Sequence, residues 1–179
     1  MQKSMPEFRR KHEIAKRVAE RIGSGGEASA FSVFSRQTGI KLAGFNIWWV
    51  PESGLGDFLT KDEIPTFEIT LINSLPGISD MHVHEVGSSL FYSLGPSHGF
   101  AIPATELLIG PWFPHLKVQE VKRVPLKEKG VTIVYPYAIH GFETKPDGTA
   151  WAIAVTSPRI SKGPNEFDLC DIRRFRIIE

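Results

Sequence analysis

Cysteine is nearly absent from this chain of 179 residues, in which Cys170 stands alone. A single cysteine excludes an internal disulfide framework, and it excludes a zinc site built from several cysteines of one chain. Disulfides are also uncommon in reducing compartments. We therefore expect a cytoplasmic protein in which Cys170 has a structural role.

Long apolar runs and an excess of one charge are also missing. No stretch approaches the roughly eighteen consecutive apolar residues of a membrane helix, and no apolar run of signal-peptide length follows the basic N-terminal residues. The formal net charge is +1, from 21 Lys and Arg against 20 Asp and Glu, so no broad field attracts nucleic acid or an anionic membrane. We expect neither of these partners, and instead a small-molecule substrate.

The composition is that of a folded globular protein. Hydrophobic residues make up 41% of the chain and charged residues 23%, and the length suits one domain with a sizeable core. Residues 6–22 place Phe8, Ile14, Val18 and Ile22 at helical spacing, with charged residues between them. The glycine-rich stretch that follows ends the predicted helix.

The helix has an apolar stripe that needs a cover, either on the main domain or on a second subunit. The sequence then divides into a helical arm at residues 1–26 and a barrel domain at residues 27–179. We predict a homodimer in which the arm takes part in assembly.

Short strand-like runs separated by Gly, Pro, Asn and Asp fill the rest of the chain, which predicts an all-β sandwich or barrel. The predicted strands are residues 30–35, 41–50, 66–73, 80–84, 89–94, 116–124, 131–135, 141–144, 150–156 and 171–178. Residues 96–114, rich in Gly, Pro and aromatic side chains, are interpreted as a packed connection or as a lid over a pocket.

Two of these strands show an alternation that orients their side chains. In residues 67–73, Phe67, Ile69 and Leu71 share one face and Glu68 and Thr70 the other, as in a half-buried strand. By the same rule His82 and His84 point to one side of their strand, roughly 7 Å apart. Imidazole is the commonest metal-ligating side chain, so the pair is a candidate half of a metal site.

A third ligand is available downstream in His140, which follows a predicted strand and Pro136. Three imidazoles on neighbouring strands can hold a divalent ion and leave coordination positions open for water, oxygen or substrate. The structural alternative is that the pair lies on a solvated face and that His140 is a hydrogen-bonded barrel histidine. We interpret His82, His84 and His140 as the metal ligands.

Together these segments resemble the two motifs of the cupin superfamily over residues 67–156. The first cupin motif contains a histidine pair and a terminal glycine, and His82, His84 and Gly95 fit it. The second motif begins with glycine, has a proline six residues later and ends in a histidine, and Gly130, Pro136 and His140 follow that order. The resemblance implies an all-β double-stranded β-helix, the cupin jelly-roll barrel, here with an N-terminal helical arm.

The chain departs from the cupin motifs at three places. Ser89 stands where the family usually supplies a glutamate ligand, Ala138 stands where glycine is common, and His140 arrives one residue early after Pro136. Glu85 is a substitute carboxylate only if the chain bends at the following Gly87, because strand alternation points it away from the histidine pair.

Some cupins with three histidines and no glutamate, such as the thiol dioxygenases, are iron-dependent. The resemblance thus implies a metal-dependent enzyme acting on a small molecule, and we favour an iron-dependent, dioxygenase-like oxidoreductase. Zinc, nickel, manganese or copper are alternative ions. The alternative functions are a non-catalytic cupin that binds or senses a metabolite or carbohydrate, and a sugar isomerase or epimerase.

The candidate catalytic residues are Tyr137 and Ser89, which would orient the substrate, and Tyr137 is the better candidate for proton transfer. Several further aromatic side chains are candidates for the pocket wall: Tyr92, Tyr135, Phe142 and Trp151.

Overall fold

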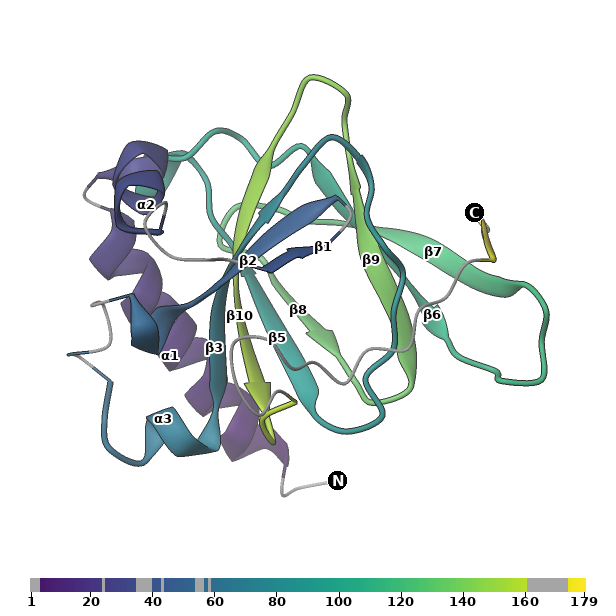
Figure 1. Cartoon of the computed structure of the whole chain (residues 1–179), viewed down its shortest axis with the longest axis horizontal. Helices are drawn as coiled ribbons and strands as arrows, with labels where there is room; N and C mark the ends of the chain where they lie inside the picture. Colours follow the sequence, from purple (N-terminus) through teal and green to yellow (C-terminus); the bar gives the residue numbers. More distant parts are fainter. Residues whose placement is uncertain are drawn as a thin grey trace.

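A computed structural model describes residues 4–23, 25–34, 40–42, 44–53, 57, 59–160 and 174–179. Cys170 lies outside these ranges, so its structural role stays a prediction. Within them, no helix combines the length and apolar character that a membrane span requires. The structure is built mainly from strands, with helices gathered on one side (Figure 1).

The described strands form two curled sheets that enclose a common interior (Figure 1). The first sheet has the spatial order β1 (Ile40–Leu42), β2 (Phe45–Trp49), β3 (Glu68–Ser74), β10 (Ala150–Ser157), β5 (Ser88–Ser93) and β8 (Val131–Val134). The second has the order β11 (Phe175–Ile177), β7 (Gln119–Pro125), β6 (Thr105–Pro111), β9 (Ala138–Thr144) and β4 (Gly77–Ile78).

The strand order from β3 to β10 defines a jelly roll. Counted along the chain from β3, the first, eighth, third and sixth strands lie side by side in one sheet, and the second, seventh, fourth and fifth in the other. This arrangement is the double-sheet jelly roll of two Greek keys that cupins use. The predicted all-β, cupin-type fold is confirmed.

The N-terminal helix α1 (Ser4–Gly23) covers the outer face of the first sheet (Figure 1). Ile14 and Val18 are fully buried in one apolar cluster with residues such as Ile153 of β10. Lys11 is also fully buried, and its Nζ donates to the backbone oxygen of Ser88 at 2.7 Å and to the Ser88 Oγ at 2.8 Å. The apolar stripe of this helix was expected to pack either on the main domain or on a second subunit, and in the structure it packs on the main domain of the same chain.

The helical content exceeds the single helix predicted. Residues 30–34, predicted as strand, belong to helix α2 (Gly26–Phe34). Gly26 has a φ of +56°, which glycine adopts without strain and which lets the chain reverse after α1. Ala30 and Phe34, one helical turn apart, then pack into the cluster beneath α1. Shorter helices are the 3-10 turn η1 (Val50–Glu52), α3 (Glu63–Thr66) and the 3-10 turn η3 (Pro96–His98).

Most of the predicted strands are present; residues 171–173 of the predicted strand 171–178 lie outside the described ranges, β4 was not predicted, and β9 begins at Ala138 instead of residue 141. Three further differences concern the following segments. Residues 41–50 are divided by a turn at Gly44 into β1 and β2. Residues 80–84 are not a continuous strand but contain an isolated bridge at His82. Residues 105–111, predicted as part of a connection, form strand β6, whose apolar Leu107 and Leu108 are fully buried.

Strand β3 is buried on both faces, so its polar side chains lie inside the barrel. Its Ile69 and Leu71 pack with α1 in the outer cluster. Its alternate residues Glu68 and Thr70 face inward and line a pocket between the sheets. The predicted half-buried strand therefore has its polar face inside the barrel, because the helix covers the apolar face.

Candidate metal site and pocket

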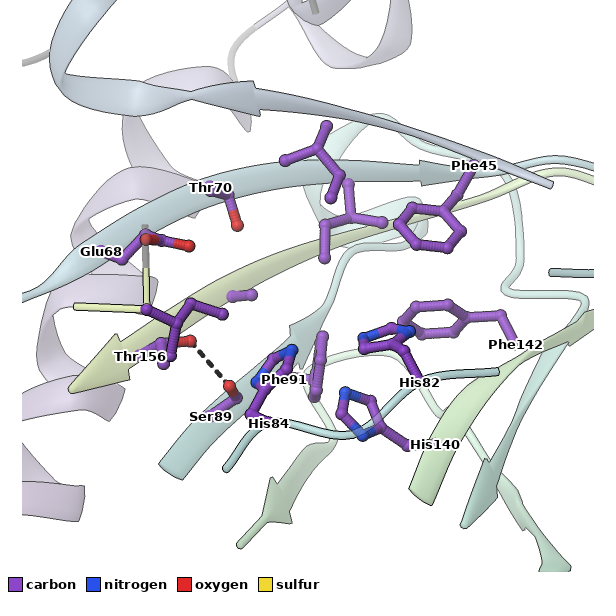
Figure 2. Close-up of a pocket in the computed structure, with 14 residues that line it drawn as sticks. Phe45, Glu68, Thr70, His82, His84, Ser89, Phe91, His140, Phe142 and Thr156 are labelled. Atoms are coloured by element: carbon purple, nitrogen blue, oxygen red, sulfur yellow. Dashed lines mark hydrogen bonds between the residues drawn. The ribbon is translucent and has the colours of Figure 1, made fainter. Parts of the chain in front are cut away.

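The barrel interior contains a small cavity of about 40 Å³ between the sheets (Figure 2). Apolar atoms make up most of its exposed surface, although as many polar as apolar residues line it, and the polar ones gather around the three histidines and on strands β3, β5 and β10. The apolar lining comprises Phe45, Ile47, Ile72, Phe91, Phe142, Ala154 and Ile160, and the polar lining comprises Glu68, Thr70, His82, His84, Ser89, His140 and Thr156. A mainly apolar cavity with a few convergent polar groups is typical of a ligand site.

The backbone holds the three histidines side by side. His82 and His140 form an antiparallel bridge, in which each amide N–H donates to the other's carbonyl oxygen at 2.9 Å. The carbonyl oxygen of His84 accepts from the Tyr137 amide at 2.9 Å. His82 and His84 both line the pocket, while Val83 between them is buried in a separate cluster behind the second sheet. The alternation predicted from the sequence therefore persists although the strand is not continuous.

The imidazole rings form a compact group (Figure 2). The ring centroids of His82 and His140 are 4.2 Å apart, those of His84 and His140 4.8 Å, and those of His82 and His84 5.1 Å. One nitrogen from each ring lies within 4.8 Å of the other two. The structure thus brings together the three predicted ligands.

Backbone carbonyls fix the tautomer of two of these rings. The Nδ1–H of His140 donates to the Ala138 carbonyl oxygen at 2.9 Å, and the Nδ1–H of His82 donates to the Asp80 carbonyl oxygen at 3.3 Å. This assignment leaves the Nε2 lone pair of each ring available, and metal-ligating histidines are commonly held in this way. The Nε2 of His140 is buried with no hydrogen-bond partner. An orphaned lone pair aimed at two other imidazoles fits a metal ion.

Burial keeps all three imidazoles neutral at physiological pH. Desolvation lowers the pKa of His82 to about 4 and that of His84 to about 3. The pKa of His140 is well below its usual value, first because of burial and second because of its two histidine neighbours. A divalent ion binds neutral imidazole, so no proton has to be displaced before it binds near neutral pH.

The metal-free protein is expected to lose stability as the pH falls from 7 to 5. In the unfolded chain a histidine has a pKa near 6.5, whereas folding holds the pKa of His82 at about 4 and that of His84 at about 3. Between these values the unfolded chain binds protons that the folded chain does not, so acidification favours unfolding by about 2 kcal/mol per histidine at pH 5. Urea unfolding of metal-free protein at both pH values measures this loss.

The His84→Gln variant should lose less stability over the same pH interval, since one of the buried titrating groups is gone. The matched control is His115→Gln, because His115 is exposed and does not line the pocket. A pH dependence in His84→Gln equal to that of the unmodified protein would contradict the assignment.

Tyr137 is not brought into the pocket. Its side chain is 54% exposed, its φ is +59°, and its ring stacks on Trp112 with centroids 6.1 Å apart. Glu85, the substitute carboxylate considered above, is exposed and does not line the cavity.

The other aromatic candidates divide between core, surface and pocket. Phe142 lines the cavity, whereas Tyr92 and Trp151 belong to the cluster beneath α1 and Tyr135 is exposed. The pocket also uses Phe45 and Phe91, which sequence reasoning did not select.

Ser89 lies in the cavity wall. It belongs to a row of three polar side chains, Ser89, Thr156 and Glu68, on neighbouring strands, and the sequence had not indicated that they lie together. Its Oγ shares a 2.7 Å hydrogen bond with Thr156 Oγ1, and Thr156 is the register partner of Ser89 on one side and of Glu68 on the other. Glu68 is only 3% exposed. The sequence did place Glu68 and Thr70 on one face of their strand. That pattern identifies them as pocket residues only when the structure shows that this face points into the barrel.

Close packing behind His140 gives a further prediction. A Cβ added at Gly141 would lie 2.4 Å from Met81 Sδ and 3.2 Å from the Asp80 carbonyl oxygen, the oxygen that holds His82. We expect Gly141→Ala to lower the free energy of unfolding by about 1–3 kcal/mol through overpacking, and to weaken metal binding roughly tenfold through the displaced support of His82.

Denaturant unfolding and metal titration measure these two effects. Gly23→Ala is the control, because a Cβ there meets His98 only at 3.4 Å, an ordinary contact. Metal affinity unchanged in Gly141→Ala would contradict the role given to the Asp80 carbonyl.

The fold and these three histidines define a cupin-type jelly roll with a three-histidine cluster in its interior, as the sequence resemblance implied. No protein-family model and no curated protein sequence matches the chain.

Solved structures match the chain at low similarity. KdgF from Halomonas sp. has a TM-score of 0.45 at 15% identity, over 71% of this chain and 93% of that one. A cupin-like protein from Thermotoga maritima has a TM-score of 0.43 at 12% identity, over 70% and 80%. Hydroxypropylphosphonic acid epoxidase from S. wedmorenis has 0.41 at 15%, over 62% and 48%.

Proposed function

We propose that this protein is a metal-dependent enzyme that acts on a small molecule, with a divalent ion held by His82, His84 and His140. The observation that carries the proposal is the cluster itself, in which three buried imidazoles gather their nitrogens within 4.8 Å. The buried, unpartnered Nε2 of His140 supports it, because an unsatisfied polar atom inside a protein calls for a functional explanation.

Iron(II) is the ion we favour, and when bound it would supply redox chemistry with molecular oxygen. Three neutral nitrogen donors also suit zinc, nickel, manganese or copper, so the donor set favours a transition metal without selecting one. Phe45, Phe91 and Phe142 surround the cluster, and their rings would exclude water and hold the apolar part of a substrate. Ser89 would help to orient the substrate from the sheet opposite.

Metal analysis of protein purified without a histidine tag tests the proposal. We expect about one equivalent of iron or another transition metal in the unmodified protein, little in His82→Ala, and oxygen uptake that depends on a member of a panel of small carboxylates, thiols and amines. Absence of metal in the native protein, with no uptake when iron(II) is supplied, would exclude the metal-site proposal.

A binding or sensing protein is the second candidate, and the position of Tyr137 favours it. The predicted proton-transfer residue is exposed and outside the cavity, which removes one acid or base that an isomerase or epimerase would use. Metal and ligand binding without turnover of any panel member would support this candidate over the enzyme.

A further inference from the structure

A row of alanines lies on the inner face of strand β10. Ala150, Ala152 and Ala154 alternate along the strand with larger residues that pack in the cluster beneath α1. All three alanines are buried, at 5–8% exposure, and their short side chains leave space that larger ones would fill. Ala154 lines the metal cavity, and Ala150 and Ala152 line a second space further along the row.

This second space has hydroxyl groups in its wall, from Ser74, Ser93 and Thr105, and we call it the hydroxyl chamber. Its volume of about 10 Å³ is roughly the room that one water molecule needs. Ile72 and Phe142 line both the hydroxyl chamber and the metal cavity, so the two spaces are neighbours in the barrel. Thr105 also lines a surface cleft, so the chamber shares a wall with solvent as well.

Ser93 carries the atom of the chamber that lacks a partner. The residue is 1% exposed, and its Oγ has no hydrogen-bond partner among the described residues. Its neighbours across the sheet are Ala152, its register partner on β10, and Gly130, whose carbonyl oxygen accepts from the Ser93 amide at 3.1 Å. Neither neighbour has a side chain that can form a hydrogen bond. Native proteins rarely leave a buried hydroxyl in this state, and a bound water is a common remedy.

The other hydroxyls of the chamber belong to a short hydrogen-bonded chain. Thr144 Oγ1 lies 2.7 Å from Ser74 Oγ and 2.7 Å from Thr105 Oγ1, and the three residues are buried, at 3–4% exposure. Each hydroxyl has one hydrogen to donate, and the two bonds of the chain use two of the three hydrogens. One hydrogen is therefore left for a further acceptor. Ser74 and Thr105, at the two ends of the chain, both line the chamber.

We propose that the hydroxyl chamber is a binding site for one water molecule, held by Ser93 and by the hydroxyl chain. The water accepts the hydrogen that the chain leaves over and donates one of its own to Ser93 Oγ, so both groups are satisfied. The ligand is water rather than an ion or an organic molecule, because the chamber has room for one water and no charged side chain of the described residues lines it. The site places this water behind Phe142, an aromatic wall of the metal cavity.

A high-resolution crystal structure of the metal-free protein tests the proposal. We expect one water within hydrogen-bond distance of Ser93 Oγ and of the Ser74 or Thr105 hydroxyl. Magnetic relaxation dispersion of the water signal counts long-lived buried waters in solution. Ala152→Val, whose larger side chain fills the chamber, should remove one of them. The matched control is Ala101→Val, at an exposed position outside the chamber, which should remove none.

Ser93→Ala distinguishes a bound water from a bare hydroxyl by the sign of its effect on stability. Where the hydroxyl holds a water, its loss removes a hydrogen bond, so the midpoint of urea unfolding should fall. A buried hydroxyl with no partner is unfavourable in itself, so its loss would raise the midpoint. Ser32→Ala, at an exposed serine of α2, is the control and should not lower the midpoint.

Three results would each overturn the proposal. They are a crystal structure with no water at Ser93, a higher urea midpoint in Ser93→Ala, and an unchanged count of long-lived waters in a folded Ala152→Val variant. If Ala152→Val fails to fold, the crystal structure and Ser93→Ala decide the question. All of these measurements use metal-free protein, so their outcome is independent of whether the three histidines bind a metal.

Discussion

Replacement of His140 by alanine is expected to reduce the affinity for divalent transition metals by a factor of about a hundred or more. Loss of a supporting group beyond the ligands typically costs 10–100-fold in metal affinity, and loss of one of three ligands should cost at least as much. His140 is fully buried and central to the cluster, with its ring within 4.8 Å of both others. Competition with a chelator of known affinity measures the change.

A matched control is His98→Ala, because His98 is also buried, at 8% exposure, but packs against Tyr92 outside the cluster. That variant should bind metal as the unmodified protein does. Equal metal affinity in the His140→Ala and His98→Ala variants would mean that the three histidines are not the ligand set.

Removal of the Ile14 side chain is expected to lower the free energy of unfolding by about 2–5 kcal/mol, the usual cost of an Ile-to-Ala change in a close-packed core. Ile14 is completely buried on the face of α1 that packs against the first sheet. Urea denaturation measures the loss, and metal stoichiometry should be retained because the site lies on the other face of that sheet.

The control for this loss is Phe31→Ala on helix α2, where the side chain is 65% exposed. Surface substitutions away from special features usually change stability by no more than about 0.5 kcal/mol. A small effect for Ile14→Ala, similar to that of Phe31→Ala, would indicate that α1 is not docked on the barrel in solution.

Docking of α1 on its own barrel also bears on assembly. The apolar stripe that could have required a second subunit is covered within the chain. The homodimer remains a prediction, and exchange of the arm is not needed to bury Ile14 or Val18. Light scattering of the unmodified protein and the Ile14→Ala variant would show whether dimer formation depends on the docking of α1.

The parts of the fold that could be predicted are those in which one local pattern decides the structure. The alternation along residues 67–73 and the apolar run at residues 150–156 predicted β3 and β10 to within two residues. Helix α2 was missed because a short segment with Ala30 and Phe34 fits either a strand or a helix until its packing partner is known. Strand β6 was missed because the flanking prolines and glycines obscured a short apolar run.

The metal cluster was accessible from the sequence because period-two spacing fixes which side chains share a face, and the cupin-like order of Pro136 and His140 supplied the third residue. The carboxylate was not accessible in the same way. Glu68 follows an ordinary half-buried pattern, and only the cover provided by α1 turns its face inward. Tyr137 was selected for its nearness to His140 in sequence, but the turn with positive φ carries its ring to the surface.

The reciprocal hydrogen bonds between His82 and His140 have a consequence for the order of events in folding. The two residues come from distant parts of the chain, so their bridge closes only when the second sheet is assembled, and contacts of this kind form slowly. A metal ion therefore has no complete site to bind in the unfolded chain or early in folding. Because the ion binds only the folded barrel, it should leave the folding rate nearly unchanged and slow the unfolding rate instead.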